Sequence, residues 1–104
     1  FDALSSIIFD EIDTGVSGEI ANLMSEMMLS MSKKRQIISV THLPQIASKA
    51  DTHFKVFKSE RNNRTISEIK RLEQSERVEE IAKMLSGKTV TETAINNAKE
   101  LLSQ

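Results

Sequence analysis

The sequence predicts an α/β fold, a lobe with parallel strands, a β-hairpin and flanking helices. Two short apolar runs, Leu4–Phe9 and Gln36–Val40, are separated by a stretch whose apolar residues have helical spacing. This is the pattern of a βαβ unit with parallel strands. Two later strand-like segments are joined by Asn62-Asn63, which suits a tight turn. Two further helical stripes of apolar residues complete the sequence.

The first strand leads into the first helix. Leu4–Phe9 is expected to be buried on both faces, as strands of parallel sheets are. Ser17 is the expected N-cap of the helix, and Lys33-Lys34-Arg35 suit its C-terminal dipole. A methionine-rich docking face is the alternative to core packing for this helix. The stripe that we expect to pack on the sheet comprises Ile20, Leu23, Met24, Met27 and Met31.

After the second strand, we expect a short helix, a hairpin and two longer helices. Thr52–Lys58 and Thr65–Arg71 form the predicted antiparallel hairpin. Gly87 is the expected C-terminal cap of the first long helix. Thr89 and Glu92 have the spacing of a capping box at the start of the second long helix.

Composition excludes several classes of protein. The 104 residues carry 14 Lys+Arg against 15 Asp+Glu, so the net charge argues neither for nor against a nucleic-acid partner. The absence of cysteine removes disulfides and thiolate metal sites and fits a reducing cytoplasm. No apolar run approaches the roughly 18–20 residues of a membrane span, so no membrane partner is expected. Because the sequence opens with Phe1 almost directly before a strand, we expect a fragment of a longer protein.

Polar side chains follow both strands of the predicted βαβ unit. Asp10, Glu11 and Asp13 come after the first strand. Thr41 and His42 come after the second. Because ligands of open α/β sheets bind beyond the carboxyl ends of the strands, these groups are expected to face one shared site. The acids suit Mg²⁺ binding and activation of a water, and the histidine suits contact with a terminal phosphate.

These motifs in combination resemble one superfamily. "SSIIFDE" is similar to the Walker B strand of SMC and ABC ATPases, "IDTGVSG" to their D-loop and "VTHLPQIA" to their switch-histidine loop. "DTGVSG" and "THLPQIA" are closer to the RecN family of bacterial DNA repair proteins than to transporter ATPases, and the likeness covers essentially all 104 residues. The resemblance implies that residues 1–104 are the C-terminal part of an ABC/SMC-type ATPase head. Such a segment is a partial P-loop NTPase fold without the Walker A and signature motifs.

The resemblance also implies roles for single residues. Asp10 would hold Mg²⁺, Glu11 would polarise the attacking water, and His42 would sense the γ-phosphate. Asp13 would communicate with a second head. The implied nucleotide-binding positions are Asp10, Asp13, Gly15, Ser17 and Gly18.

The same resemblance implies cofactors, partners and a cellular role. The implied cofactors are ATP and Mg²⁺. The implied partners are the N-terminal head segment of the same protein, a second head in a homodimer, and DNA. The implied role is ATP hydrolysis for DNA double-strand break repair and recombination, in the bacterial cytoplasm at the nucleoid.

One segment comes close to a phosphate-binding loop. "AKMLSGKT", from Ala82 to Thr89, fits the rule G-x-x-x-x-G-K-[ST] if alanine replaces the first glycine. A working loop opens a helix, whereas the spacing of Val78, Ile81 and Leu85 makes this segment the end of one. We therefore expect that these 104 residues alone do not hydrolyse ATP.

The residues also leave alternatives open. One is another ABC-type ATPase, such as a transporter subunit. Another is an independent metal-dependent hydrolase that uses the acids and His42. In the plainest alternative the acids are solvated, and both His42 and His53 are structural. A last alternative is a non-catalytic module that binds DNA or protein through a basic hairpin, whose cations are Lys55, Lys58, Arg61, Arg64, Lys70 and Arg71.

Overall fold

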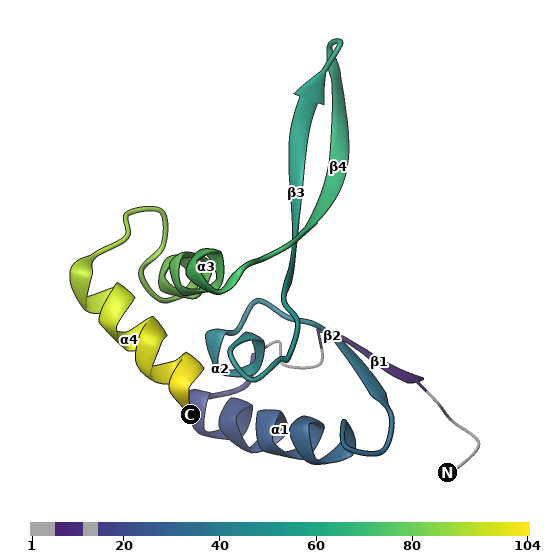
Figure 1. Cartoon of the computed structure of the whole chain (residues 1–104), viewed down its shortest axis with the longest axis vertical. Helices are drawn as coiled ribbons and strands as arrows, with labels where there is room; N and C mark the ends of the chain where they lie inside the picture. The colour runs from purple at the N-terminus through teal and green to yellow at the C-terminus, as the bar shows by residue number, and fades with distance from the viewer. Residues whose placement is uncertain (1–5, 12–14) are drawn as a thin grey trace.

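The computed structural model describes residues 6–11 and 15–104. Along them the elements follow in the order β1, α1, β2, α2, β3, β4, α3, α4 (Figure 1). The strands are Ser6–Asp10 (β1), Gln36–Val40 (β2), Phe54–Arg61 (β3) and Arg64–Arg71 (β4). The helices are Gly18–Met31 (α1), Pro44–Ala47 (α2), Gln74–Ser86 (α3) and Glu92–Ser103 (α4). The predicted α/β fold, with parallel strands, a hairpin and flanking helices, is confirmed.

Strands β1 and β2 are parallel neighbours, as the βαβ pattern predicted. Their alternation leaves Ile7 and Phe9 half-buried on one face. On the other face, Ile8 is 66% exposed and its register partner Ile38 is 43% exposed. The prediction that Leu4–Phe9 is buried on both faces is therefore wrong for the described part of the strand, because the described residues cover one face only.

Helix α1 packs through a narrow stripe of mostly small side chains. Ala21, Ser25 and Met28 are buried, and the helix contacts α2. The predicted stripe placed Leu23 and Met27 in the core, yet these side chains are 57% and 51% exposed. The stripe was assigned to the wrong side because α1 carries apolar residues on more than one face, so spacing alone does not select the packed face.

The buried core lies where α2, α3 and α4 meet. Alanines dominate it, and small side chains let the helices approach closely. Ile81 is its large member and is fully buried. The cluster comprises Ala47, Ile81, Ala82, Ala94 and Ala98.

The ends of α3 and α4 test three predictions. Gly87 caps the C-terminus of α3 at φ 83°, a left-handed conformation that suits glycine, as predicted. The segment resembling a phosphate-binding loop therefore lies at the end of a helix, as predicted. The capping box of Thr89 and Glu92 is wrong, because α4 begins later. Thr91 is the N-cap, and its hydroxyl accepts a hydrogen bond from the Ala94 N–H at 3.1 Å.

Strands β3 and β4 form the predicted antiparallel hairpin, which projects away from the helices (Figure 1). Asn62 and Asn63 make the turn at φ 52° and 63°, which confirms the predicted turn. The hairpin is longer than predicted: β3 continues to Arg61 rather than ending at Lys58. Its start is also later than Thr52, so that His53 precedes the strand.

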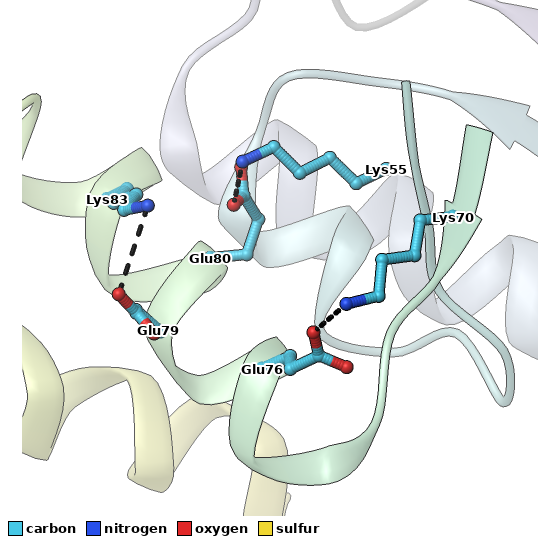
Figure 2. A network of polar contacts seen from close by, with 6 residues as sticks. All are labelled: Lys55, Lys70, Glu76, Glu79, Glu80 and Lys83. Carbon is cyan, nitrogen blue, oxygen red and sulfur yellow. Dashed lines mark hydrogen bonds and ion pairs between the residues drawn. The ribbon is translucent and has the colours of Figure 1, made fainter. Parts of the chain in front are cut away.

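Charged pairs attach one face of the hairpin to α3 (Figure 2). Lys55 Nζ lies 2.9 Å from a carboxylate oxygen of Glu80, and Lys70 donates to Glu76. The paired strands place their alternate residues on the opposite face, which is open to solvent. This outer face carries Phe54, Val56 and Ile69, which are 54%, 69% and 67% exposed.

Candidate functional site

Asp10 and Glu11 stand at the carboxyl end of β1. Asp10 is the last strand residue and pairs in register with Val40. The Glu11 N–H donates to the Val40 carbonyl at 2.8 Å, which ties the two strand ends together. Glu11 has φ 52°. This left-handed conformation is uncommon for a residue other than Gly, Asn or Asp, and such strain clusters at functional sites.

Three of the predicted nucleotide-binding positions, Gly15, Ser17 and Gly18, lie at or just before the start of α1. Gly15 adopts φ 79°, which favours glycine. The Ser17 hydroxyl accepts a hydrogen bond from the Ile20 N–H at 3.3 Å, so the predicted N-cap is confirmed. Gly18 is the first residue of α1. Asp13, a further predicted nucleotide-binding position, lies outside the described residues.

The segment after β2 leads into α2, which contacts α1. The Thr41 hydroxyl accepts a hydrogen bond from the Leu43 N–H at 3.0 Å, and Leu43 is the N-cap of α2. His42, between them, is exposed. A side chain at Gly18 would come within 3.5 Å of Gln45 Nε2, so the start of α1 lies against α2.

The strand pairing places four of the residues that the sequence assigned to one site on neighbouring strand ends. The predicted edge has Asp10 and Glu11 on one strand end and Thr41 and His42 on its direct neighbour, with no strand between them. Adjacent parallel strands lie about 4.8 Å apart. The pairing of β1 with β2 therefore places the strand end that bears the carboxylates beside the segment that bears His42.

The donor set fits Mg²⁺ held jointly with phosphate. Asp10 and Glu11 offer carboxylate oxygens, the ligand type that Mg²⁺ prefers. Within residues 6–11 and 15–104, no three Asp, Glu or His side chains gather closely enough to hold a metal ion by themselves. Mg²⁺ usually retains several waters and takes one or two carboxylates plus substrate phosphates. The described residues thus suit a metal that arrives with a phosphate ligand.

Sequence reasoning missed Arg77. Its side chain is buried at 9% exposure, and Nη2 donates to the carbonyls of Ala47 and Ala50, at 3.3 and 2.8 Å. Burial lowers the pKa of the Arg77 guanidinium, and the Asp51 carboxylate opposes that shift. One signal was available: Arg77 precedes Ile81 by four positions, so helical spacing places it on the buried face of α3.

His53 is half-buried and close to Arg77. Its Nδ1 is buried and has no hydrogen-bond partner among the described residues. Burial lowers the pKa of His53, and the Arg77 cation lowers it further, whereas the Glu80 carboxylate raises it. These features support the structural role that the sequence suggested for His53.

The basic hairpin is partly neutralised by its own neighbours. Glu80, Glu68 and Glu76 pair with three of its six cations, Lys55, Arg61 and Lys70. A groove between the hairpin and α3 is lined by two of these pairs, Lys55–Glu80 and Lys70–Glu76, and none of the predicted site residues lines it. Because three of its six cations are paired with carboxylates, the hairpin is a weaker candidate for binding phosphates than its sequence suggested.

The fold is that of an SMC ATPase head. A solved chain from work on the structural biochemistry of ATP-driven dimerization and DNA-stimulated activation of SMC ATPases superposes with a TM-score of 0.63. The match covers 83% of this chain and 50% of that chain, at 20% sequence identity. No family model matches the sequence.

The sequence comparisons show which proteins the chain is similar to. The chain matches the C-terminal segment of RecN, a DNA repair protein. It is 48% identical to RecN of Rickettsia conorii over 97 residues, 93% of this chain, and 45% identical to RecN of Bacillus subtilis over 101 residues, 97% of this chain. RecN of Halalkalibacterium halodurans is 44% identical over 99 residues. The chain spans about 18% of the length of these relatives.

These matches favour RecN over a transporter subunit. The relatives are DNA repair proteins, and the structural neighbour comes from work on SMC ATPases. In the part of the chain that the structure describes, no helix is long and apolar enough to cross a membrane.

Proposed function

We propose that this chain forms one wall of an ATP site in a RecN-type DNA repair protein, which hydrolyses ATP in double-strand break repair and recombination. The conformation of Glu11 carries the proposal. A hydrogen bond to Val40 holds this residue at φ 52° beside the segment that bears His42. Strain at an exposed carboxylate next to a strand-end histidine is expected of a reaction site rather than of a solvated surface.

Each residue at the edge has a distinct role in the proposal. Asp10 holds Mg²⁺, which supplies charge neutralisation to the phosphates when it is bound. Glu11 orients the attacking water and accepts its proton as the water oxygen bonds to the γ-phosphorus, while the bond from that phosphorus to the β,γ-bridging oxygen breaks and ADP leaves with the electron pair. His42 donates a hydrogen bond to a γ-phosphate oxygen. Gly15, Ser17 and Gly18 line the nucleotide beside them.

Partners complete the proposed site. The N-terminal head segment of the same protein supplies the loop that grips the phosphates, and the 104 residues alone do not turn over ATP. A second head in a homodimer closes the site, and Asp13 communicates with it. DNA is the partner of the complete protein, and the cytoplasm is its location.

The test is ATP turnover by the complete protein. Glu11→Gln keeps the size of the side chain and removes the base, so turnover is expected to fall roughly 10²–10³-fold, within the range measured for general bases. Asp10→Asn is expected to raise the Mg²⁺ concentration needed for half-maximal rate. Glu19→Gln, an exposed residue of α1, is the matched control. Parental turnover in Glu11→Gln would contradict the proposal.

A further inference from the structure

Helix α2 is too short to hold its own position. Pro44–Ala47 is a single turn, and isolated helices of this length are unstable in water. Its last carbonyls have no partners within the helix. The location of α2 is therefore set by the elements that it contacts, which are α1 and α3.

Arg77 provides the polar part of that contact. From α3, its Nη2 donates to the carbonyls of Ala47, Ser48 and Ala50, at 3.3, 3.5 and 2.8 Å. These carbonyls gather at the C-terminal end of α2, where the helix dipole is negative and a cation is favourable. The rigid, planar guanidinium presents its donors in a fixed geometry that a flexible amine does not reproduce.

Only some of the hydrogen-bond donors of the Arg77 guanidinium have partners. Its Nε is buried and has no hydrogen-bond partner among the described residues. Burying a cation with part of its donor capacity unused is unfavourable. The side chain thus binds the carbonyls at the end of α2 through Nη2 alone. An apolar side chain in this position would cost less to bury.

The other end of α2 carries the candidate site. Leu43 caps the helix, and its N–H is bound by the Thr41 hydroxyl. His42 lies between these two residues, so its backbone is fixed by the end of β2 on one side and by α2 on the other. A shift of α2 moves His42 directly.

We propose that Arg77 is a positioning residue for His42: by anchoring the far end of α2, it sets where the imidazole stands relative to Glu11. The inference rests on the proposed function of that edge. The helix that carries Arg77, α3, is itself joined to the hairpin by two ion pairs. Lys55 and Lys70 of the hairpin pair with Glu80 and Glu76 of α3 on either side of Arg77 in the sequence (Figure 2).

The test uses the complete protein with three substitutions. Arg77→Met keeps the apolar stem and removes the donors, and Arg77→Lys keeps the charge without the planar geometry. Lys83→Met is the control on the same helix, because its Nζ lies 3.9 Å from Glu79, at the limit of an ion pair. The readouts are kcat, the Kd of Mg-ATPγS and hydrogen exchange of the peptide spanning residues 41–47.

The expected result separates kcat from binding. Arg77→Met is expected to lower kcat about tenfold, because a misplaced group of this kind costs up to 10²-fold, while the Kd changes less than about twofold. Exchange of residues 41–47 rises, and exchange of α4 does not. Arg77→Lys recovers part of both effects, and Lys83→Met leaves both at the parental level.

Two outcomes overturn the inference. One is a parental kcat in Arg77→Met. The other is a rise in exchange that includes α3 and α4 equally, which would mark Arg77 as a general stability residue. Glu11→Gln, measured alongside, separates the two proposals. If it loses turnover while Arg77→Met does not, only the positioning role fails. If it retains turnover, the proposed function fails, and exchange of residues 41–47 still decides whether Arg77 holds the loop.

Discussion

The helical part of the molecule and its parallel sheet differ in how completely their apolar surfaces are covered. Between α2, α3 and α4, Ile81 and four alanines are buried in one cluster. Across β1, β2 and α1, large apolar side chains remain open, among them Ile8, Leu23, Met27 and Val40. Contiguous exposed apolar surface marks an interaction site.

The helical part therefore has its own buried core, whereas the sheet and α1 present an exposed apolar surface. The candidate site lies on the less covered part, at the edge where β1 and β2 end. In the proposal, that part is completed by the N-terminal head segment of the same protein. The helical part then acts as the fixed body to which the site-bearing loop is attached through α2.

The largest expected effect is on the helical core. Ile81 is fully buried, so Ile81→Ala is expected to lower the free energy of unfolding of the 104-residue chain by about 2–5 kcal/mol. Ile38→Ala, on the open face of the sheet, is the matched change and is expected to cost less than about 1 kcal/mol. Urea unfolding of both variants measures the contrast. Equal costs would contradict the distinction between the two parts.

The same two substitutions test the distinction in the complete protein. There, the proposed head segment covers the open face of the sheet, so the cost of Ile38→Ala is expected to rise toward the roughly 2–5 kcal/mol of a buried site. Thermal unfolding of the complete protein is the measurement. A cost that stays as small as in the 104-residue chain would mean that this face is not covered.

A smaller effect is expected at the start of α4. Thr91→Ala removes the hydroxyl that accepts from Ala94 N–H and is expected to cost about 1 kcal/mol. Thr89→Ala changes the residue that the sequence pattern favoured as the cap, and it is expected to be close to neutral. Chemical unfolding of the two variants distinguishes these positions. The reverse order would restore the capping box of Thr89 and Glu92.

The smallest expected effect is the pH dependence due to His53. Burial and Arg77 lower its pKa below the ordinary value of 6.5, so the folded state binds a proton less readily than the unfolded state. Stability from this group is complete above pH 6.5 and falls as the pH drops from 6.5 toward the lowered pKa. The hydrogen bond from Lys70 lowers the pKa of the Glu76 carboxylate. This group changes the stability only when the pH falls below its ordinary pKa of 4.5.

Urea unfolding between pH 7.5 and 5.0 isolates the histidine. His53→Gln is expected to flatten the decline over this interval, because glutamine binds no proton there. The unsubstituted chain provides the reference profile. An undiminished decline in His53→Gln would contradict the assignment.

Local patterns predicted most of the fold because their causes are local. Ser17, Gly87 and Asn62-Asn63 each satisfy a backbone requirement that a few residues define, and the structure has all three where the sequence placed them. The parallel pairing of β1 with β2, which puts the ends of the two strands side by side, followed from the βαβ pattern.

The failures involve contacts between distant segments. Which face of α1 is packed depends on α2, and spacing alone put Met27 rather than Met28 in the core. The anchoring role of Arg77 depends on carbonyls about 30 positions earlier in the sequence. The sequence places a charged residue, Arg77, on the apolar face of α3. This pattern indicates that Arg77 has a buried hydrogen-bond partner, but it does not identify the partner.

The most direct test of the account locates the nucleotide on the complete protein. Hydrogen exchange with and without Mg-ATPγS compares the peptides that carry Asp10–Glu11 and Thr41–Leu43 with the hairpin turn at Asn62-Asn63. The account predicts that the nucleotide slows exchange in the first two peptides and leaves the turn unchanged. Protection of the turn, with no change at Asp10–Glu11 and Thr41–Leu43, would contradict it.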